Sequence, residues 1–265
     1  MNLKDLRVLV TGGGGTGIGG GVCEALASFG ATLIINDLDP EKAKSAAEKY
    51  PGAISVGADI SKRGEVAAMF EEIKEKTGVI NGLVNNAGVG LSRLSYEVSD
   101  EEFDKLYNID IRAVWQVSKF FVRQLIDNRS TGNIVNISSV HAFATHARYA
   151  LYCSVKSAVE GLTKGMACEL GQYNIRCNAI GPGLVKAEQN YDLIKTWADD
   201  PVQWEIDYVN YQQVIPKNIY PVDCGNTVAF LLSDYSAAIT GQTIYVDAGT
   251  TVMLFNSDFI ERSSS

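Results

Sequence analysis

Leu6-Arg7-Val8-Leu9-Val10-Thr11-Gly12-Gly13-Gly14-Gly15-Thr16-Gly17-Ile18-Gly19 begins the stretch that decides the fold, and this stretch runs on to Asp37. The apolar run at 7–10 leads through the glycines into a helical pattern that ends near Phe29-Gly30, and a second apolar run, Thr32 to Asn36, stops on the acid. Strand, glycine turn, helix and strand in this order predict the βαβ unit that binds a dinucleotide. The glycines let the backbone approach a pyrophosphate, and the helix N-terminus offers unpaired N–H groups.

Asp37 stands where such a unit carries an acid that accepts hydrogen bonds from the adenosine ribose hydroxyls. A 2′-phosphate at this place would meet a carboxylate, and Leu38-Asp39-Pro40 supplies no Arg or Lys to offset it. We therefore expect NAD rather than NADP. A plain tight loop is the alternative for a glycine-rich turn by itself, but the flanking strand, helix and acid favour cofactor binding.

Size and composition restrict the class of protein. The 265 residues are 46% hydrophobic, enough to bury a sizeable core, and an α/β sheet of this length commonly forms one domain. We expect a single α/β domain over 1–265, a Rossmann doubly wound parallel sheet with helices on both faces. The net charge of −8 argues against nucleic acid or an anionic membrane as partner. No apolar run could span a bilayer and no signal peptide precedes the first strand, so we expect a cytoplasmic protein.

The cysteines and histidines give no metal or disulfide pattern. His141 and His146 are the only histidines, too few for a histidine-based metal site, and we expect no metal. The five cysteines are scattered without C-x-x-C spacing, which favours buried, reduced thiols: Cys23, Cys153, Cys168, Cys177 and Cys224.

The rest of the chain alternates predicted helices and strands. Asp39-Pro40 predicts a helix start, with the end at Tyr50-Pro51-Gly52. Ser61 is expected to cap the next helix, and Ser99 with Glu102 forms a capping box for another. Further strands are expected at 53–57, 82–84, 134–137, 175–180 and 243–247, and the later helices at 99 to about 126, 149 to about 170 and 222–233.

Residues 184–220 lack clear periodicity and are rich in aromatic side chains. A connection this long inside a compact domain is usually functional, so we expect a substrate lid. The end of the chain, Ser263-Ser264-Ser265, is expected to be frayed.

Tyr152 and Lys156 are four residues apart and so share one helix face. A tyrosine phenol has an ordinary pKa near ~10, and an adjacent ammonium lowers it, so the pair can exchange a proton with an alcohol or a carbonyl. On spacing alone a solvated helix face is the alternative. Ser139, which ends a predicted strand, and Asn85-Asn86-Ala87-Gly88, which ends another, add polar groups at the ligand-binding edge of the sheet.

These motifs together resemble the short-chain dehydrogenase/reductase family, and the resemblance runs from Leu6 to about Gly249. That family's turn usually reads Thr-Gly-x-x-x-Gly-x-Gly; here it is one residue longer, because four residues separate Gly12 from Gly17. The resemblance implies that Ser139 hydrogen-bonds the reacting oxygen and that Tyr152 is the acid/base. It implies that Lys156 holds the nicotinamide ribose and tunes Tyr152, and that Asn108 positions a water linking Lys156 to solvent.

The expected cofactor-binding residues come from the motifs and from this resemblance. Asp59-Ile60 is implied to lie against the adenine ring; on spacing alone, Asp59 as a turn or cap residue before Ser61 is the alternative. The threonine that the family commonly has five residues after Pro182 is Ala187 here. The full expected set is Gly12, Gly15, Thr16, Gly17, Ile18, Asp37, Leu38, Asp59, Ile60, Asn86, Ala87, Gly88, Tyr152, Lys156, Pro182, Gly183 and Val185.

The resemblance implies an NAD(H)-dependent oxidoreductase that interconverts a secondary alcohol and a ketone. Lys186, Glu188, Gln189 and Asn190 give the lid mixed polarity, which favours a sugar or polyol. The alternatives are a hydroxysteroid or other bulky cyclic alcohol, a 3-oxoacyl reductase, and a non-catalytic NAD-binding sensor. Family members are usually tetramers or dimers, so a homo-oligomer is expected.

Overall fold

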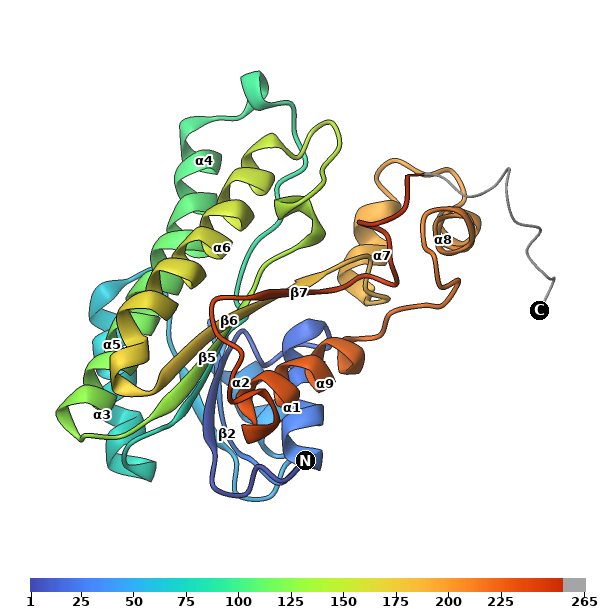
Figure 1. Cartoon of the computed structure of the whole chain (residues 1–265). Coiled ribbons are helices and arrows are strands. Elements are labelled where there is room, and N and C mark those ends of the chain that lie inside the picture. The colour runs from blue at the N-terminus through green and yellow to red at the C-terminus, as the bar shows by residue number, and fades with distance from the viewer. Residues whose placement is uncertain (255–265) are drawn as a thin grey trace.

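The computed structural model describes residues 1–254, and over these residues seven strands form one sheet (Figure 1). Residues 255–265, which include Ser263–Ser265 and the end of the expected domain, lie outside the described residues. The strands are β1 (Arg7–Thr11), β2 (Thr32–Asp37), β3 (Ile54–Gly57), β4 (Gly82–Asn85), β5 (Gly132–Ile137), β6 (Ile175–Pro182) and β7 (Thr243–Val246).

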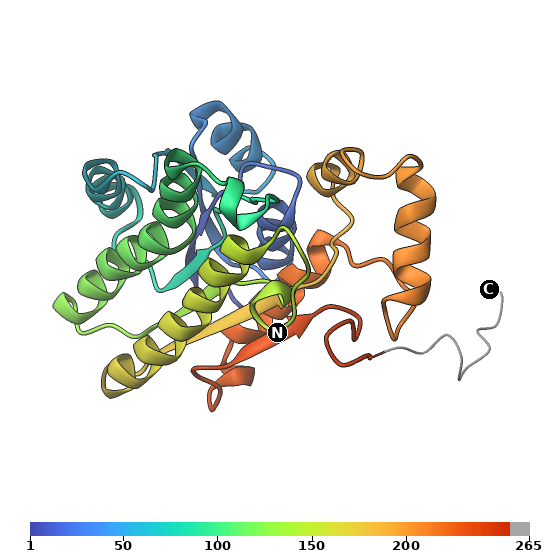
Figure 2. The ribbon, with the colours of Figure 1, turned by 90° about the horizontal axis from the view of Figure 1, so that it is seen from above.

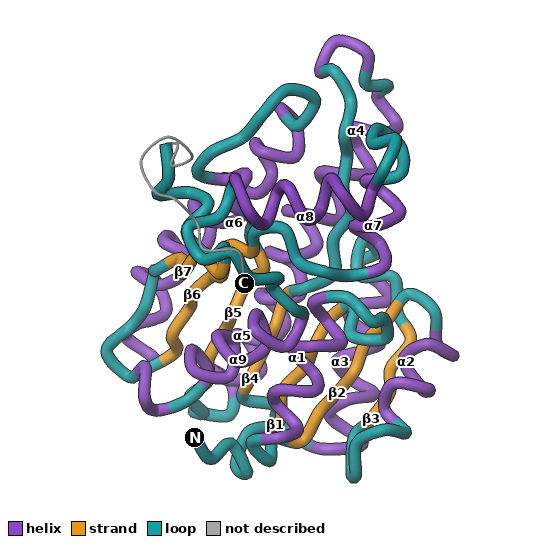
Figure 3. The backbone as a smooth tube through the Cα atoms, turned by 90° about the vertical axis from the view of Figure 1, so that its right-hand side faces the viewer, coloured by secondary structure: helices purple, strands orange, loops and turns teal. Residues whose placement is uncertain are grey.

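The strand order is β3-β2-β1-β4-β5-β6-β7, and every neighbouring pair is parallel. Figure 3 shows the strands side by side. The chain builds outward from β1 to β3 and then returns to place β4 on the other side of β1. The order therefore reverses between β1 and β4, which is where sheets of this kind bind ligands. The predicted doubly wound parallel sheet is confirmed.

Helices cover both faces of the sheet. One buried cluster joins α1, α2 and α9 to the sheet, and a second joins α3, α5 and α6 to the opposite face. The helices are α1 (Ile18–Ser28), α2 (Pro40–Ala47), α3 (Arg63–Thr77), α4 (Asp100–Tyr107), α5 (Val114–Asp127), α6 (Ala150–Leu170), α7 (Glu188–Ile194), α8 (Pro201–Tyr211) and α9 (Pro221–Leu232).

The central strands are buried on both faces, which explains why they read as continuous apolar runs. Val8 and Val10 of β1 pack into the first cluster, whereas Leu9 between them packs into the second. All three side chains are fully buried. Phe121 of α5, the largest fully buried side chain, lies in the second cluster.

Helices α1 and α9 pack backbone to backbone behind the glycine turn. A side chain at Gly21 of α1 would collide with the backbone of Pro221, and one at Gly225 of α9 would collide with the carbonyl of Gly21. Glycine at both positions therefore lets the helices approach closely, and this contact fixes the direction in which α1 leaves the turn.

Two predicted helix boundaries need correction. Asp39 caps α2 as expected, accepting from the amides of Glu41 and Lys42, but the helix ends at Ala47 and not at Tyr50. Ser61 does not cap α3, which begins at Arg63 after Lys62. The Ser61 amide and hydroxyl instead donate to Asp59 Oδ1, at 3.0 and 2.7 Å.

The helix expected from residue 99 to about 126 is interrupted. The capping box of Ser99 and Glu102 is confirmed at its start. A π-helical turn, Asn108–Ala113, separates α4 from α5. A π turn inserts one residue into an α-helix and is frequent at functional sites.

Residues 184–220 contain two helices that the sequence analysis did not predict, α7 and α8. Figure 3 shows both above the carboxyl end of the sheet, and Figure 2 shows α8 standing apart from the main body of the ribbon. A parallel bridge between Val185 and Ile219 joins the two ends of the segment. The segment lies at the edge of the sheet where ligands are expected (Figure 3).

Candidate active site

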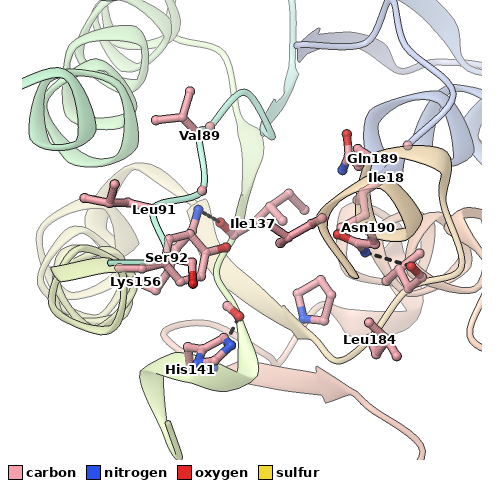
Figure 4. Close-up of a pocket in the computed structure, with 18 of the residues that line it drawn as sticks. Ile18, Val89, Leu91, Ser92, Ile137, His141, Lys156, Leu184, Gln189 and Asn190 are labelled. Carbon is pink, nitrogen blue, oxygen red and sulfur yellow. Dashed lines mark hydrogen bonds between the residues drawn. The ribbon is translucent and has the colours of Figure 1, made fainter. Parts of the chain in front are cut away.

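A cavity of about 1700 Å³ opens at the carboxyl ends of the strands. Small-ligand pockets commonly measure roughly 300–1,000 Å³, so this one has room for a dinucleotide together with a substrate. Figure 4 shows part of its wall, with Ile18 and Gln189 at one side and Lys156, Leu91 and Ser92 at the other. The predicted site residues that line it are Gly12, Gly15, Thr16, Gly17, Ile18, Asp37, Leu38, Ile60, Asn86, Ala87, Gly88, Ser139, Tyr152, Lys156, Pro182, Gly183 and Val185.

The glycine turn is held against the end of β4. Gly12 has a φ of +63°, a conformation that favours glycine, and a Cβ there would lie 3.0 Å from the Cα of Ala87. The Asn86 side-chain amide donates to the carbonyls of Thr11 and Gly12, at 2.9 and 3.1 Å. The Asn-Asn-Ala-Gly segment therefore fixes the start of the turn.

The longer turn is tied to the acid at the end of β2. Asp37 Oδ2 accepts from the Gly14 amide at 3.1 Å, and Oδ1 accepts from the Asp39 amide at the same distance. The carboxylate remains in the cavity wall, where it has lone pairs left for further donors. Lys42 lines the same wall, although the sequence analysis found no cation beside Asp37.

These observations fit a nicotinamide dinucleotide. From Gly12 to Gly17 the turn carries only one side chain, that of Thr16, and it leads directly into the N-terminus of α1. The N-cap residue of α1, Gly17, makes no side-chain capping bond, so the first amides of the helix are not capped from within. Asp37, at the end of β2, lines the same cavity as Pro182 and Gly183, at the end of β6.

Ser139, Tyr152 and Lys156 lie together in the cavity wall. Lys156 is 6% exposed, donates to the Ile137 carbonyl at 3.3 Å, and places its Nζ 5.4 Å from the centre of the Tyr152 ring. Ser139 follows β5, and its Oγ accepts from the amide of His141 at 3.2 Å. A phenol, an ammonium and a hydroxyl are thus gathered at one place, as the spacing predicts.

Asp110 is the residue that the sequence analysis missed. Its carboxylate pairs with Lys156 at 2.9 Å, and it lines the cavity. Asn108, the predicted relay residue, is not part of the wall; its Oδ1 accepts from Arg112 at 3.5 Å. The structure therefore brings Asp110, and not Asn108, to Lys156, because the π-helical turn places residue 110 on the inner side.

Asp59 is likewise outside the cavity wall, although its neighbours Ala58 and Ile60 line it. Its carboxylate is occupied by Ser61 and pairs with Lys62 at 3.4 Å. These bonds correspond to the alternative in which Asp59 is a turn residue.

An aromatic and histidine cluster also lines the cavity beside Tyr152. The His141 ring stacks on Tyr149 at 4.5 Å and meets His146 and Tyr152 edge-on at 5.0 and 5.6 Å. Burial and then the charge of His146 lower the pKa of His141 to about 4. His141 is therefore neutral at physiological pH. In the sequence, only the two histidines near Ser139 pointed to this cluster.

Segment 184–220 forms the opposite wall. The Gln189 amide lies over the glycine turn, since a Cβ at Gly17 would be 3.1 Å from Gln189 Nε2. Trp197 and Trp204 meet edge-on at 5.9 Å, and Tyr208 stacks on Trp204 at 5.4 Å. All three aromatic side chains line the cavity.

The cysteines, all within the described residues, are free. Burial raises the pKa of Cys23, Cys177 and Cys224 to about 12, so these three thiols pack and do not react. Cys153 is half-buried, and Cys168 is exposed, contrary to the expectation that all five are buried. Among residues 1–254 no helix could cross a membrane, and no cluster of His, Cys, Asp or Glu could hold a metal ion.

Comparison with known proteins gives whole-length similarity. The family described as enoyl-(acyl carrier protein) reductase matches residues 13–251. Carbonyl reductase [NADPH] 2 from Sus scrofa is 34% identical, covering 94% of this chain and 98% of its own. L-xylulose reductase from Homo sapiens is 35% identical over 93% of this chain and 97% of the reductase. The solved structure of a short-chain type dehydrogenase/reductase from Mycobacterium ulcerans superposes with a TM-score of 0.85 at 28% identity. The match covers 95% of this chain and 92% of that one.

Proposed function

This chain belongs to the short-chain dehydrogenase/reductase family, and from that membership we propose an NAD(H)-dependent enzyme that interconverts a secondary alcohol of a sugar or polyol and the corresponding ketone. Membership makes the chain an alcohol–ketone oxidoreductase with a nicotinamide cofactor. The preference for NAD and the substrate class are our proposals. The observation that carries them is that one cavity is lined both by Ser139, Tyr152 and Lys156 and by Asp37.

The chain's own groups handle the proton. A bound nicotinamide supplies or accepts the hydride. The Tyr152 hydroxyl gives a proton to the carbonyl oxygen in reduction and takes it from the alcohol in oxidation. The Lys156 ammonium stabilises the phenolate from 5.4 Å, measured to the ring centre. The Ser139 hydroxyl donates to the reacting oxygen, since its Oγ already accepts from the amide of His141.

Asp37 supports NAD over NADP. Both of its carboxylate oxygens are oriented by backbone amides, so the charge is fixed in the wall where the ribose hydroxyls would lie. Two observations oppose this preference: Lys42 lines the same wall, and carbonyl reductase [NADPH] 2 is named for the other cofactor. The proposal is therefore that the fixed carboxylate outweighs the exposed lysine.

The lid side of the cavity supports a polyol. Acids and amides of segment 184–220, including Glu188, Gln189 and Asp207, line it and can bind several hydroxyls. The relative L-xylulose reductase is named for a sugar ketone. Trp197, Trp204 and Tyr208 favour the second candidate, a bulky cyclic alcohol, because apolar rings line the same wall. A lid at 184–220, a cytoplasmic location and a homo-oligomer remain predictions.

A substrate panel tests the proposal. Polyols, sugars and hydroxysteroids are incubated with NAD, and NADH absorbance is followed. A response to polyols with none to steroids supports the first candidate, and the reverse supports the second. Tyr152→Phe should abolish turnover but leave NADH binding intact, whereas Tyr235→Phe, at an exposed residue outside the cavity wall, should change neither. Near-normal turnover in folded Tyr152→Phe would contradict the assignment.

A further inference from the structure

A buried ion pair lies beneath the proposed acid/base. Asp110 is 1% exposed and Lys156 is 6% exposed, and Asp110 Oδ2 lies 2.9 Å from Lys156 Nζ. The other carboxylate oxygen, Oδ1, accepts from the Val89 amide at 2.8 Å. A buried carboxylate is costly unless it is paired and hydrogen-bonded, and here both conditions are met.

The backbone of Gly88 lies close against the pair, so a side chain at that position would crowd both charged groups. A Cβ at Gly88 would lie 3.0 Å from Asp110 Oδ2 and 3.4 Å from Lys156 Nζ. Lys156 also donates to the Ile137 carbonyl at 3.3 Å. The ammonium is therefore held from two sides, by a neutral carbonyl at the end of β5 and by a full negative charge from the π-helical turn.

The two donors around Asp110 require two acceptors. A carboxylate offers one oxygen to the Val89 amide and the other to the Lys156 ammonium. An asparagine side chain has a single acceptor oxygen, so its NH₂ group would face one of these two donors. The geometry thus calls for the charged side chain.

We propose that Asp110 is a positioning residue that fixes the Lys156 ammonium under Tyr152 and sets the pH range in which the pair works. The proposal rests on the function proposed above. Asp110 does not act on substrate directly; it acts through Lys156.

The charged surroundings of Lys156 give the sign of the effect. Burial alone would lower the pKa of Lys156, but the charges of Tyr152 and Asp110 outweigh it, so the pKa is raised. His141, facing Tyr152, is neutral above about pH 4. Glu160, one turn beyond Lys156, is bonded to the Ser138 and Tyr245 hydroxyls. A negative charge beside a group makes that group hold its proton more tightly. Removing the Asp110 charge therefore lowers the pH at which Lys156 and Tyr152 lose their protons.

The first test uses Asp110→Asn, which removes the charge and keeps the size. Its rate-against-pH profile for alcohol oxidation should move to lower pH as a whole, by about one unit. Asp104→Asn, an exposed change of equal charge in α4, should leave the profile in place. A merely structural residue would lower the rate without moving the profile. An unmoved profile, or one displaced to higher pH, overturns the proposal.

A second test needs no turnover and no folded Asp110 variant. The Lys156 side-chain nitrogen is followed by NMR against pH in the unaltered protein, with its signal assigned by its loss in Lys156→Arg. It should remain an ammonium above the ordinary lysine pKa of ~10.4. Loss of the proton below that value overturns the proposal. A held ammonium in a protein without dehydrogenase activity would instead refute the proposed function alone.

Discussion

Replacing Asp37 by asparagine tests the cofactor preference with little change in shape. In the unaltered protein a 2′-phosphate would lie beside a carboxylate that the Gly14 and Asp39 amides hold in place. At ~4 Å two unit charges repel by about 1 kcal/mol in water and about 4 kcal/mol at an effective dielectric of about 20. Each ~1.4 kcal/mol is tenfold in affinity, so the preference for NADH should be roughly ten- to a thousandfold.

Lys42 moves this expectation toward its lower end, because its exposed ammonium lines the same wall and attracts the phosphate. Asp37→Asn should bring the dissociation constants of NADH and NADPH within a few-fold of each other, and Lys42→Ala should widen the gap. One amide loses its charged acceptor in Asp37→Asn, so the free energy of unfolding should fall by about 1 kcal/mol.

The measurement is a fluorescence titration of both reduced cofactors, which requires no knowledge of the substrate. Glu41→Gln, at an exposed residue in the first turn of α2, makes the same change in net charge and should leave the ratio unchanged. Equal affinities or an NADPH preference in the unaltered protein would refute the reasoning, as would a ratio that Asp37→Asn does not change.

Three other measurements bear on the lid, the helix contact and the histidine cluster. Proteolysis within 184–220 should slow when NADH and a substrate analogue are both bound, because a closing lid shields its backbone; equal rates in both forms would indicate a fixed cover. Gly21→Ala should destabilise the fold by about 1–3 kcal/mol in urea unfolding, since the methyl group meets Pro221, whereas Gly64→Ala in open space should not. The pKa of His141 is lowered to about 4 in the folded chain, so the unfolded chain binds more protons between about pH 4 and 6.5 and stability rises with pH there. His141→Asn should flatten this rise, by about 1–2 kcal/mol after allowance for partial solvent exposure, and an unchanged slope would contradict the account.

Most of the sheet could be predicted because its central strands are buried on both faces and so appear in the sequence as apolar runs. The same physics explains why α8 was missed. None of its residues is buried, so no apolar stripe marks one face. Its start did carry a signal, because Asp200-Pro201 repeats the pattern of Asp39-Pro40, and both aspartates cap their helices.

Residues of the candidate site could be predicted where a sequence motif specifies the residue type. They could not be predicted where a residue's role depends on its burial in the folded chain. Ser139, Tyr152 and Lys156 were found from spacing and resemblance. Asp110 was missed because a carboxylate inside an expected helix looks like a solvated residue, and only the fold reveals that it is buried against Lys156. Asn108 was chosen for its side-chain type, two positions away from the residue that the structure brings to the lysine.

The π-helical turn at Asn108–Ala113 makes chain length, as well as residue type, a determinant of this site. The π turn holds one residue more than a regular α-helical turn, and each residue turns an α-helix by about 100°. Deleting one residue there would therefore let α4 and α5 join as an unbroken helix. The buried side chains of Val117, Phe121 and Leu125 would still face the sheet. The hydrophobic core would tolerate such a deletion. Asp110, however, would leave its place beside Lys156. Relatives with an insertion or deletion in this turn should therefore keep the fold but lose this ion pair.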